Sequence, residues 1–108
     1  MKKLFYVEPS QMLRIGLKSV FSGDDWEIYT LDSMDDFDFR IKDFAPDILL
    51  LDGSFYNNGN LEKIRASVTQ IPVGFMSKEP VASSDDYFFI KKPISLSEIK
   101  EVVENFLK

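Results

Sequence analysis

Residues 46–55 have the sequence PDILLLDGSF, in which residues 48–51 (ILLL) are apolar at every position. A strand that is covered on both faces has this composition, which is typical of parallel sheets with helices on each side. Asp52 follows the apolar run directly, and Gly53 comes next. This stretch therefore predicts a buried central strand that ends in a carboxylate.

Four further apolar runs flank this stretch at regular spacing. They cover residues 4–7, 26–31, 71–76 and 87–90. Neighbouring runs are centred about 22 or 23 residues apart, except for the last two, which are about 16 apart, and this spacing is typical of βα units in a parallel sheet. The run 26–31 (WEIYTL) admits the polar residues Glu27 and Thr30, which favours an edge position.

The gaps between the runs carry apolar residues at helical spacing. The four stripes are Leu13, Leu17, Val20 and Phe21; Met34, Phe37, Ile41 and Phe44; Leu61, Ile64 and Val68, which follow Asn60; and Ile99, Val102, Val103, Phe106 and Leu107. Ser10 and Ser33 stand in N-cap position, and residues 95–98 (SLSE) form a capping box before the last stripe. Gly23 follows the first stripe, where helices often end. We expect all four stripes to pack in the core.

The fourth gap, residues 78–86, contains nine residues, one of which is Pro80. An average helix alone has about 11 residues, and its connections need several more. This crossover is therefore predicted to hold at most one helical turn.

Composition limits what the chain can do. With 108 residues, 44% of them hydrophobic, we expect one domain spanning residues 1–108. The absence of Cys and His excludes disulfides, thiolate metal sites and the commonest general base. The net charge of −5 argues against nucleic-acid binding. No apolar run reaches membrane-spanning length. We therefore expect a soluble cytoplasmic protein that does not bind membranes.

Polar residues follow the strands at their carboxyl ends, which share one edge in a parallel sheet. Glu8 follows the first run and Asp52 the third, while Ser77 and the segment Lys91-Lys92-Pro93 follow the fourth and fifth. Each has a simpler explanation as a turn, a cap or a solvated charge. Together, two carboxylates, a hydroxyl and an amine can hold a divalent cation and accept a phosphoryl group.

The chain resembles response-regulator receiver domains, such as the chemotaxis regulators, along its whole length. The matching segments are residues 4–21 (LFYVEPSQMLRIGLKSVF), 46–55, 71–77 (IPVGFMS) and 85–107 (DDYFFIKKPISLSEIKEVVENFL). The resemblance implies an α/β, three-layer, doubly wound flavodoxin-like fold with a five-stranded parallel sheet in the order 2-1-3-4-5 and a truncated fourth helix.

The same resemblance implies roles for individual residues. Asp52 would be the phosphoacceptor, and Glu8, Asp52 and the backbone carbonyl of Ser54 would form the metal pocket. Ser77 would be the switch hydroxyl and Lys92 the phosphate-contacting lysine. Phe89 would occupy the position of the switch aromatic residue, and Pro93 would follow a cis peptide bond.

Four departures from the receiver pattern predict an atypical member. Pro9 stands where the family has a second acid, so Mg²⁺ binding is expected to be weak. Phe89 lacks the hydroxyl of a switch tyrosine. The fourth helix is truncated, and residues 53–59 (GSFYNNG) lack the usual proline, with Asn58-Gly59 expected to form a flexible turn.

These observations leave three functions open. The chain is a pseudo-receiver that acts through protein–protein interaction, or a phosphoacceptor in a two-component phosphorelay that a histidine kinase modifies on Asp52, or a small enzyme on the same sheet. The enzyme is the least favoured, because a flavodoxin phosphate loop and the second Asp of a dehalogenase-type phosphatase are both missing. Because the fourth crossover is short, we expect the last strand and the final helix to form a face for a downstream partner or a homodimer. Alternate residues of a strand point to opposite faces, so either Phe88 or its neighbours Tyr87 and Phe89 should lie on the less-covered side.

Overall fold

A parallel five-stranded sheet in the order β2-β1-β3-β4-β5 forms the centre of the protein, as the resemblance implies. The computed structural model describes residues 1–23, 25–79 and 86–107. Its elements are β1 (Lys2–Val7), α1 (Gln11–Val20), β2 (Trp26–Leu31), α2 (Phe37–Phe44), β3 (Ile48–Asp52), the 3₁₀ turn η1 (Gly53–Phe55), α3 (Asn58–Ser67), β4 (Val73–Ser77), β5 (Phe88–Lys91) and α4 (Leu96–Phe106). None of the described helices is long and apolar enough to cross a membrane.

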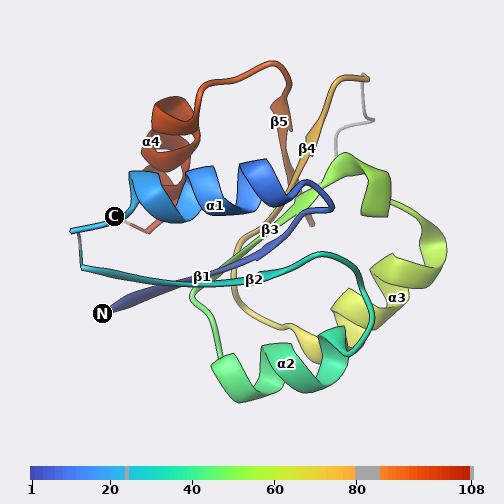
Figure 1. Cartoon of the computed structure of the whole chain (residues 1–108). Helices are drawn as coiled ribbons and strands as arrows, with labels where there is room; N and C mark the ends of the chain where they lie inside the picture. Colours follow the sequence, from blue (N-terminus) through green and yellow to red (C-terminus); the bar gives the residue numbers. More distant parts are fainter. Residues whose placement is uncertain (24, 80–85, 108) are drawn as a thin grey trace.

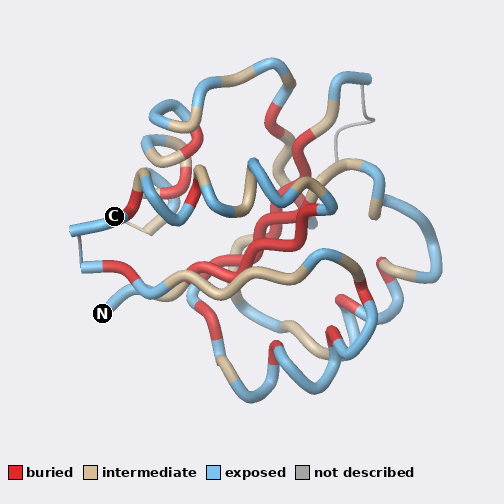
Figure 2. Tube along the Cα trace, viewed as in Figure 1, coloured by how far each residue is buried: buried red, intermediate tan, exposed pale blue. Residues whose placement is uncertain are grey.

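Helices cover both faces of the sheet, which gives three layers (Figure 1). Helices α1 and α4 lie on one face, and α2 and α3 lie on the other. The apolar run of β3 divides between two cores, because Leu50 packs with α1 and α4 while Leu49 and Leu51 pack with α2 and α3. Figure 2 shows the resulting buried stretch through the middle of the sheet. The predicted doubly wound, three-layer arrangement is confirmed.

The strand register places the carboxyl ends at one rim. Val7 pairs with Leu51, and Asp52 pairs with Met76 on the next strand. Ser77 then pairs with Lys91. The residues that end or follow β1, β3, β4 and β5 therefore lie along the same edge, which is the condition for a shared site.

The predicted boundaries of α1 and the predicted start of α4 are confirmed. The side chain of Ser10 accepts a hydrogen bond from the Leu13 N–H and caps α1. Ser95 and Glu98 form the capping box at the start of α4. Gly23 follows α1 with a φ of 85°, in the left-handed region that glycine adopts without strain.

The predicted start of α2 was wrong. Ser33 does not cap the helix, because its side chain accepts a hydrogen bond from the Asp35 N–H and closes a turn instead. Helix α2 begins at Phe37, after Asp36 in a left-handed conformation. A serine hydroxyl that bonds to a nearby backbone N–H competes with helix formation, and here the turn prevails. Met34 is nevertheless buried in the core as predicted.

The segment Asn58-Gly59 was also misassigned, because it forms the first turn of α3 and not a flexible turn. Asn57 is the N-cap, and its side chain accepts a hydrogen bond of 2.9 Å from the Asn60 N–H. The predicted truncated fourth helix falls largely on residues 80–85, which lie outside the described residues. Residues 78, 79, 86 and 87, at the two ends of that connection, are not helical.

Candidate functional site

The centre of the rim is an ion-pair cluster of three side chains. The Nζ atom of Lys92 lies 2.5 Å from Oδ1 of Asp52 and 3.7 Å from Oε1 of Glu8. The three residues come from the ends of β5, β3 and β1. The side chains of Lys92 and Asp52 are 19% and 16% exposed, whereas that of Glu8 is 3% exposed. The structure thus brings three of the predicted site residues together.

Both carboxylate oxygens of Asp52 accept hydrogen bonds. Oδ1 accepts the bond from Lys92, and Oδ2 accepts two bonds from Ser54, one from its N–H (3.1 Å) and one from its hydroxyl (2.6 Å). The turn η1 folds Ser54 back toward the carboxylate. Burial acts to raise the pKa of Asp52, but the hydrogen bonds from Lys92 and Ser54, together with the charge of Lys92, outweigh burial and hold this pKa below its ordinary value. Asp52 is therefore a stable anion.

Glu8 is enclosed by donors from its own strand and loop. Its Oε1 atom accepts a hydrogen bond of 2.9 Å from the Tyr6 hydroxyl, and its Oε2 atom accepts one of 3.2 Å from the Ser10 N–H. The Arg14 guanidinium donates a hydrogen bond of 2.5 Å to the backbone carbonyl of Glu8. Burial, followed by the nearby charge of Glu8, raises the pKa of the Tyr6 hydroxyl far above its usual range. The phenol therefore keeps its proton and donates to Glu8.

Tyr6 and Arg14 were missed by the sequence analysis. A signal for Tyr6 was present, because residues two apart on a strand point to the same face and Tyr6 stands two positions before Glu8. The contact of Arg14 depends on how α1 leaves the loop after β1, which the sequence pattern does not specify.

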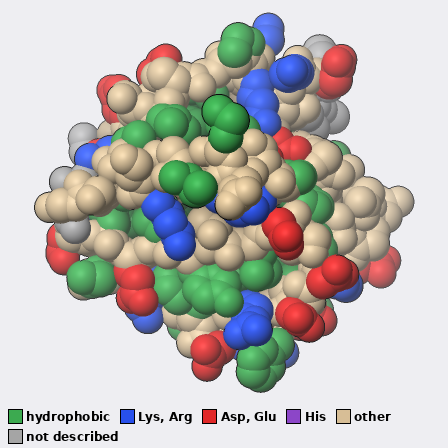
Figure 3. Space-filling model, viewed as in Figure 1, with side chains coloured by type: hydrophobic (Ala, Val, Ile, Leu, Met, Phe, Trp, Pro, Cys, Tyr) green, Lys and Arg blue, Asp and Glu red, His purple; other side chains and the backbone are tan. Residues whose placement is uncertain are grey.

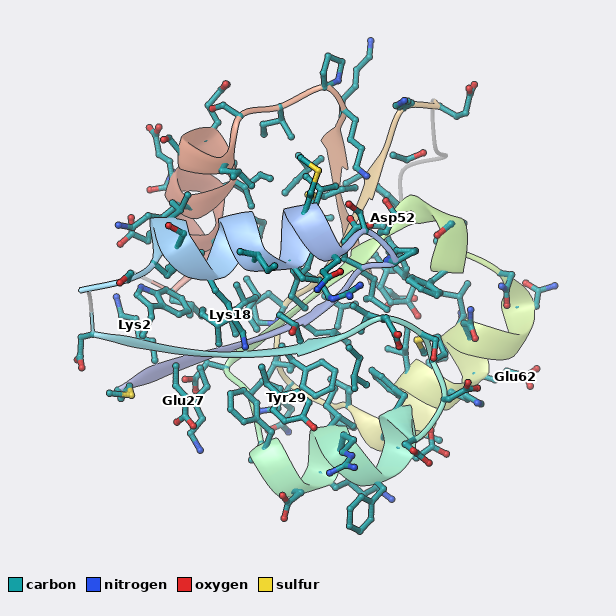
Figure 4. The ribbon with its side chains drawn as sticks, in the orientation of Figure 1. Lys2, Lys18, Glu27, Tyr29, Asp52 and Glu62 are labelled. Carbon is teal, nitrogen blue, oxygen red and sulfur yellow. The ribbon has the colours of Figure 1, made fainter. Side chains whose placement is uncertain are left out.

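Ser77 lines the same pocket as Asp52 and bonds within its own turn. Its hydroxyl accepts a hydrogen bond of 3.2 Å from the Glu79 N–H. The pocket has a volume of about 450 Å³. Its lining consists of Asp52, Gly53, Ser54, Met76, Ser77, Lys78, Glu79 and Lys92. Figure 4 shows Asp52 at this rim, where β3 ends. The described residues therefore leave an open, polar pocket on one side of the carboxylate.

The aromatic residues in β5 and directly before it are packed on both faces of the sheet. Phe89 is half-buried and stacks on Phe75, with ring centroids 6.1 Å apart. Phe88 stacks on Phe106 of α4, with centroids 4.0 Å apart. Tyr87 is buried against the edge of Phe75, which leaves Phe88 as the more exposed of the two predicted partner-face residues. The peptide bond between Lys92 and Pro93 is cis, as the resemblance implies.

The donor set around Asp52 fits Mg²⁺ poorly. The described residues contain no group of three or more Asp, Glu, His or Cys side chains that is able to hold a metal ion. The cation Lys92 pairs with both Glu8 and Asp52, and Pro9 contributes no carboxylate. The third predicted ligand, the backbone carbonyl of Ser54, is a neutral oxygen and adds no negative charge. Mg²⁺ requires near-octahedral oxygen ligation and loses its water reluctantly, so two engaged carboxylates are a weak basis for a site.

Comparisons with known proteins identify the fold. No family model matches the chain, and no curated protein matches its sequence. The N-terminal domain of a lantibiotic response regulator, the nisin resistance regulator NsrR, is 26% identical, with a TM-score of 0.75 over 100% of this chain and 99% of that one. The receiver domain of the hybrid histidine kinase CckA is 19% identical (TM-score 0.79; 98% and 99% covered). A receiver domain protein from Bacillus halodurans is 14% identical (TM-score 0.80; 97% and 96% covered). The chain has the fold of response-regulator receiver domains.

Proposed function

We propose that this chain, which has the receiver fold, is a signalling module of the pseudo-receiver type. It acts through protein–protein interaction, and its Mg²⁺-dependent phosphorylation is impaired. The carrying observation is that Lys92 pairs with both Asp52 and Glu8 while position 9 is a proline. In this proposal the chain retains the receiver fold and the charged rim, and it transmits its signal by binding another protein.

Electrostatics support this proposal. The formal charges of Glu8, Asp52 and Lys92 sum to −1, whereas an acid at position 9 would bring the sum to −2. At an effective dielectric constant of about 20, one unit-charge contact at 4 Å is worth about 4 kcal/mol before desolvation. A divalent cation at this rim lacks one such contact, and it also meets the positive charge of Lys92.

A second candidate is a functional phosphoacceptor that a histidine kinase modifies. The specific observation in its favour is that Asp52 borders an open pocket together with Ser77 and Lys92. In that reaction a carboxylate oxygen of Asp52 attacks phosphorus, the bond between phosphorus and the imidazole nitrogen of the kinase's phosphohistidine breaks, and the imidazole leaves with the bonding electron pair. Lys92 and Ser77 would then contact the phosphoryl oxygens.

Intact mass spectrometry separates the two candidates. The protein is incubated with Mg²⁺ and acetyl phosphate, and Asp52→Asn serves as the matched control. We expect no phosphoryl adduct on the wild-type chain under conditions that label a competent receiver domain in parallel. An adduct that forms on the wild type and disappears in Asp52→Asn supports the phosphoacceptor and contradicts the pseudo-receiver.

We also propose where the module works and what it binds. Its partner is a histidine kinase or a downstream signalling protein in the cytoplasm, or a second copy of the chain, and it catalyses no reaction of its own. On the face shown in Figure 3, acidic and basic side chains are interspersed, an arrangement that does not favour a nucleic-acid or membrane partner.

For the homodimer, Phe106 extends the predicted partner face of Phe88, because Phe106 is 44% exposed and stacks on Phe88. Sedimentation of wild type and Phe106→Ser over a range of concentrations tests the homodimer.

A further inference from the structure

Glu8 is a buried acid whose oxygens are already committed. Its side chain is 3% exposed. The Oε1 atom accepts a hydrogen bond of 2.9 Å from the Tyr6 hydroxyl and lies 3.7 Å from Nζ of Lys92. The other oxygen accepts the Ser10 N–H at 3.2 Å. A carboxylate that is removed from water needs such partners, because its charge is otherwise unfavourable there.

Tyr6 contributes a donor that most residues at a core position of a strand do not have. It is 1% exposed and packs among the apolar residues beneath α1 and α4. A phenylalanine would fill the same space but would donate no hydrogen bond. The hydroxyl therefore acts on Glu8 specifically, whereas the ring contributes to the core.

The bond from Tyr6 competes with a cation for the same oxygen. A metal ion binds a carboxylate through oxygen lone pairs, and Oε1 directs lone-pair density toward the Tyr6 hydroxyl and Lys92. Hydrogen bonds to an ionised acceptor are among the stronger ones in proteins, so giving this bond up opposes metal binding. The Arg14 guanidinium, which bonds to the Glu8 carbonyl oxygen, adds a second positive charge near the same acid.

We propose that Tyr6 is a positioning residue that suppresses divalent-cation binding at this rim by holding the Glu8 carboxylate in its hydrogen bonds with Tyr6 and Ser10. The inference rests on the proposed function, since it names the residue that keeps Glu8 from serving a metal. It predicts that removing one hydroxyl group increases the affinity of the protein for Mg²⁺.

The test is calorimetric titration of Mg²⁺ into wild type and Tyr6→Phe. We expect Tyr6→Phe to bind Mg²⁺ about tenfold more tightly or better, because a hydrogen bond to a charged group contributes about 1.5–3 kcal/mol and about 1.4 kcal/mol corresponds to tenfold. Paramagnetic broadening by Mn²⁺ provides a second readout, and it should affect the amide signals of Ser10 and Ser54 more strongly in the variant. Tyr29→Phe is the matched control, since Tyr29 stacks on Phe5 beside α2, away from the rim (Figure 4).

A double-variant cycle shows whether the effect passes through Glu8. In a Glu8→Gln background, the change Tyr6→Phe should leave Mg²⁺ affinity unaltered. Unchanged affinity in folded Tyr6→Phe, or an equal gain in the Glu8→Gln background, overturns the inference. If Tyr6→Phe fails to fold, Tyr6→Leu makes the same comparison, and loss of folding in both variants contradicts the assignment of the hydroxyl to metal exclusion. Labelling of the wild type by acetyl phosphate would contradict the proposed function and would leave this comparison of affinities standing.

Discussion

Lys92 donates a hydrogen bond of 2.5 Å to Oδ1 of Asp52 from a position 40 residues away in sequence. Asp52 ends β3, and Lys92 follows β5. These two strands are not neighbours, because β4 lies between them in the sheet. The lysine therefore reaches across the end of β4 to meet the carboxylate. This contact exists because the parallel strands end at the same level.

Replacing Lys92 with Met should raise the pKa of Asp52. Burial acts to raise this pKa in the wild type, and the hydrogen bonds from Lys92 and Ser54 more than offset it. Without the lysine, the remaining bonds oppose burial alone. A carbon-detected NMR titration of the Asp52 carboxyl group measures the pKa in both proteins, and Lys91→Met is the control because Lys91 is exposed and directly precedes Lys92 at the end of β5. Equal midpoints in wild type and Lys92→Met would contradict the assignment.

The same pair should make stability depend on pH. The folded-state pKa of Asp52 lies below its ordinary value of 3.8, so the ionised carboxylate stabilises the fold fully above about pH 4. This contribution is lost as the pH falls through the folded-state pKa. Urea unfolding should therefore show a difference between wild type and Lys92→Met at pH 7 that shrinks at acidic pH. A difference in unfolding free energy between the two proteins that grows on acidification would contradict this prediction.

Gly53→Ala should disturb the rim directly. A Cβ at position 53 would lie 2.7 Å from the Ser77 Cβ and 2.8 Å from the carbonyl oxygen of Met76. Because a backbone oxygen cannot swing away, the ends of β3 and β4 must separate. We expect a loss of about 1–3 kcal/mol in the free energy of unfolding, as for overpacking elsewhere. Urea denaturation measures this loss, and amide shifts at Asp52 and Ser54 report the displacement.

Gly59→Ala is the matched control for that substitution. Gly59 lies in the first turn of α3, and the nearest atom to an added Cβ is the Asn57 Oδ1 at 3.6 Å. Alanine is favoured over glycine in helices by up to about 1 kcal/mol, so Gly59→Ala should be neutral or stabilising. Similar losses at both glycines would show that the contact with Ser77 is not the cause.

Gly74→Ala should displace the ring of Phe88. A Cβ at position 74 would lie 2.2 Å from two atoms of that ring, which stacks on Phe106. We expect a loss of about 1–3 kcal/mol in unfolding free energy by urea denaturation. Adding Phe88→Leu should recover part of the loss, because the smaller side chain relieves the clash. Strictly additive losses in the double variant would exclude this contact.

The sheet and the starts of α1 and α4 were predictable because they depend on local patterns. The run ILLL at residues 48–51 specifies a strand buried on both faces, and the serines at 10 and 95 cap helices as their positions suggest. Ser33 shows the limit of such reasoning, because a cap and a turn use the same hydroxyl and the sequence does not say which forms. Asn58-Gly59 became helical because Asn57 caps the segment.

The candidate site was predictable as a set of strand ends but not as a network. Glu8, Asp52 and Lys92 follow from the rule that parallel strands present their carboxyl ends together. Their pairing depends on side-chain reach, which spacing alone does not give. The Tyr6 hydroxyl was overlooked because a tyrosine within an apolar run looks like core, and its ring is indeed part of the core. Only the geometry shows that its hydroxyl bonds to Glu8.

The most direct test of the account is the Mg²⁺ affinity of the wild type beside that of Pro9→Asp, with Pro9→Ala as the control for loss of the proline ring. Pro9 is exposed in the loop between β1 and α1, so an Asp side chain has room there. We predict saturable Mg²⁺ binding in Pro9→Asp by calorimetry, and none at physiological Mg²⁺ concentrations in the wild type or Pro9→Ala. Binding by the wild type as tight as that of Pro9→Asp would contradict the claim that this rim lacks a metal ligand.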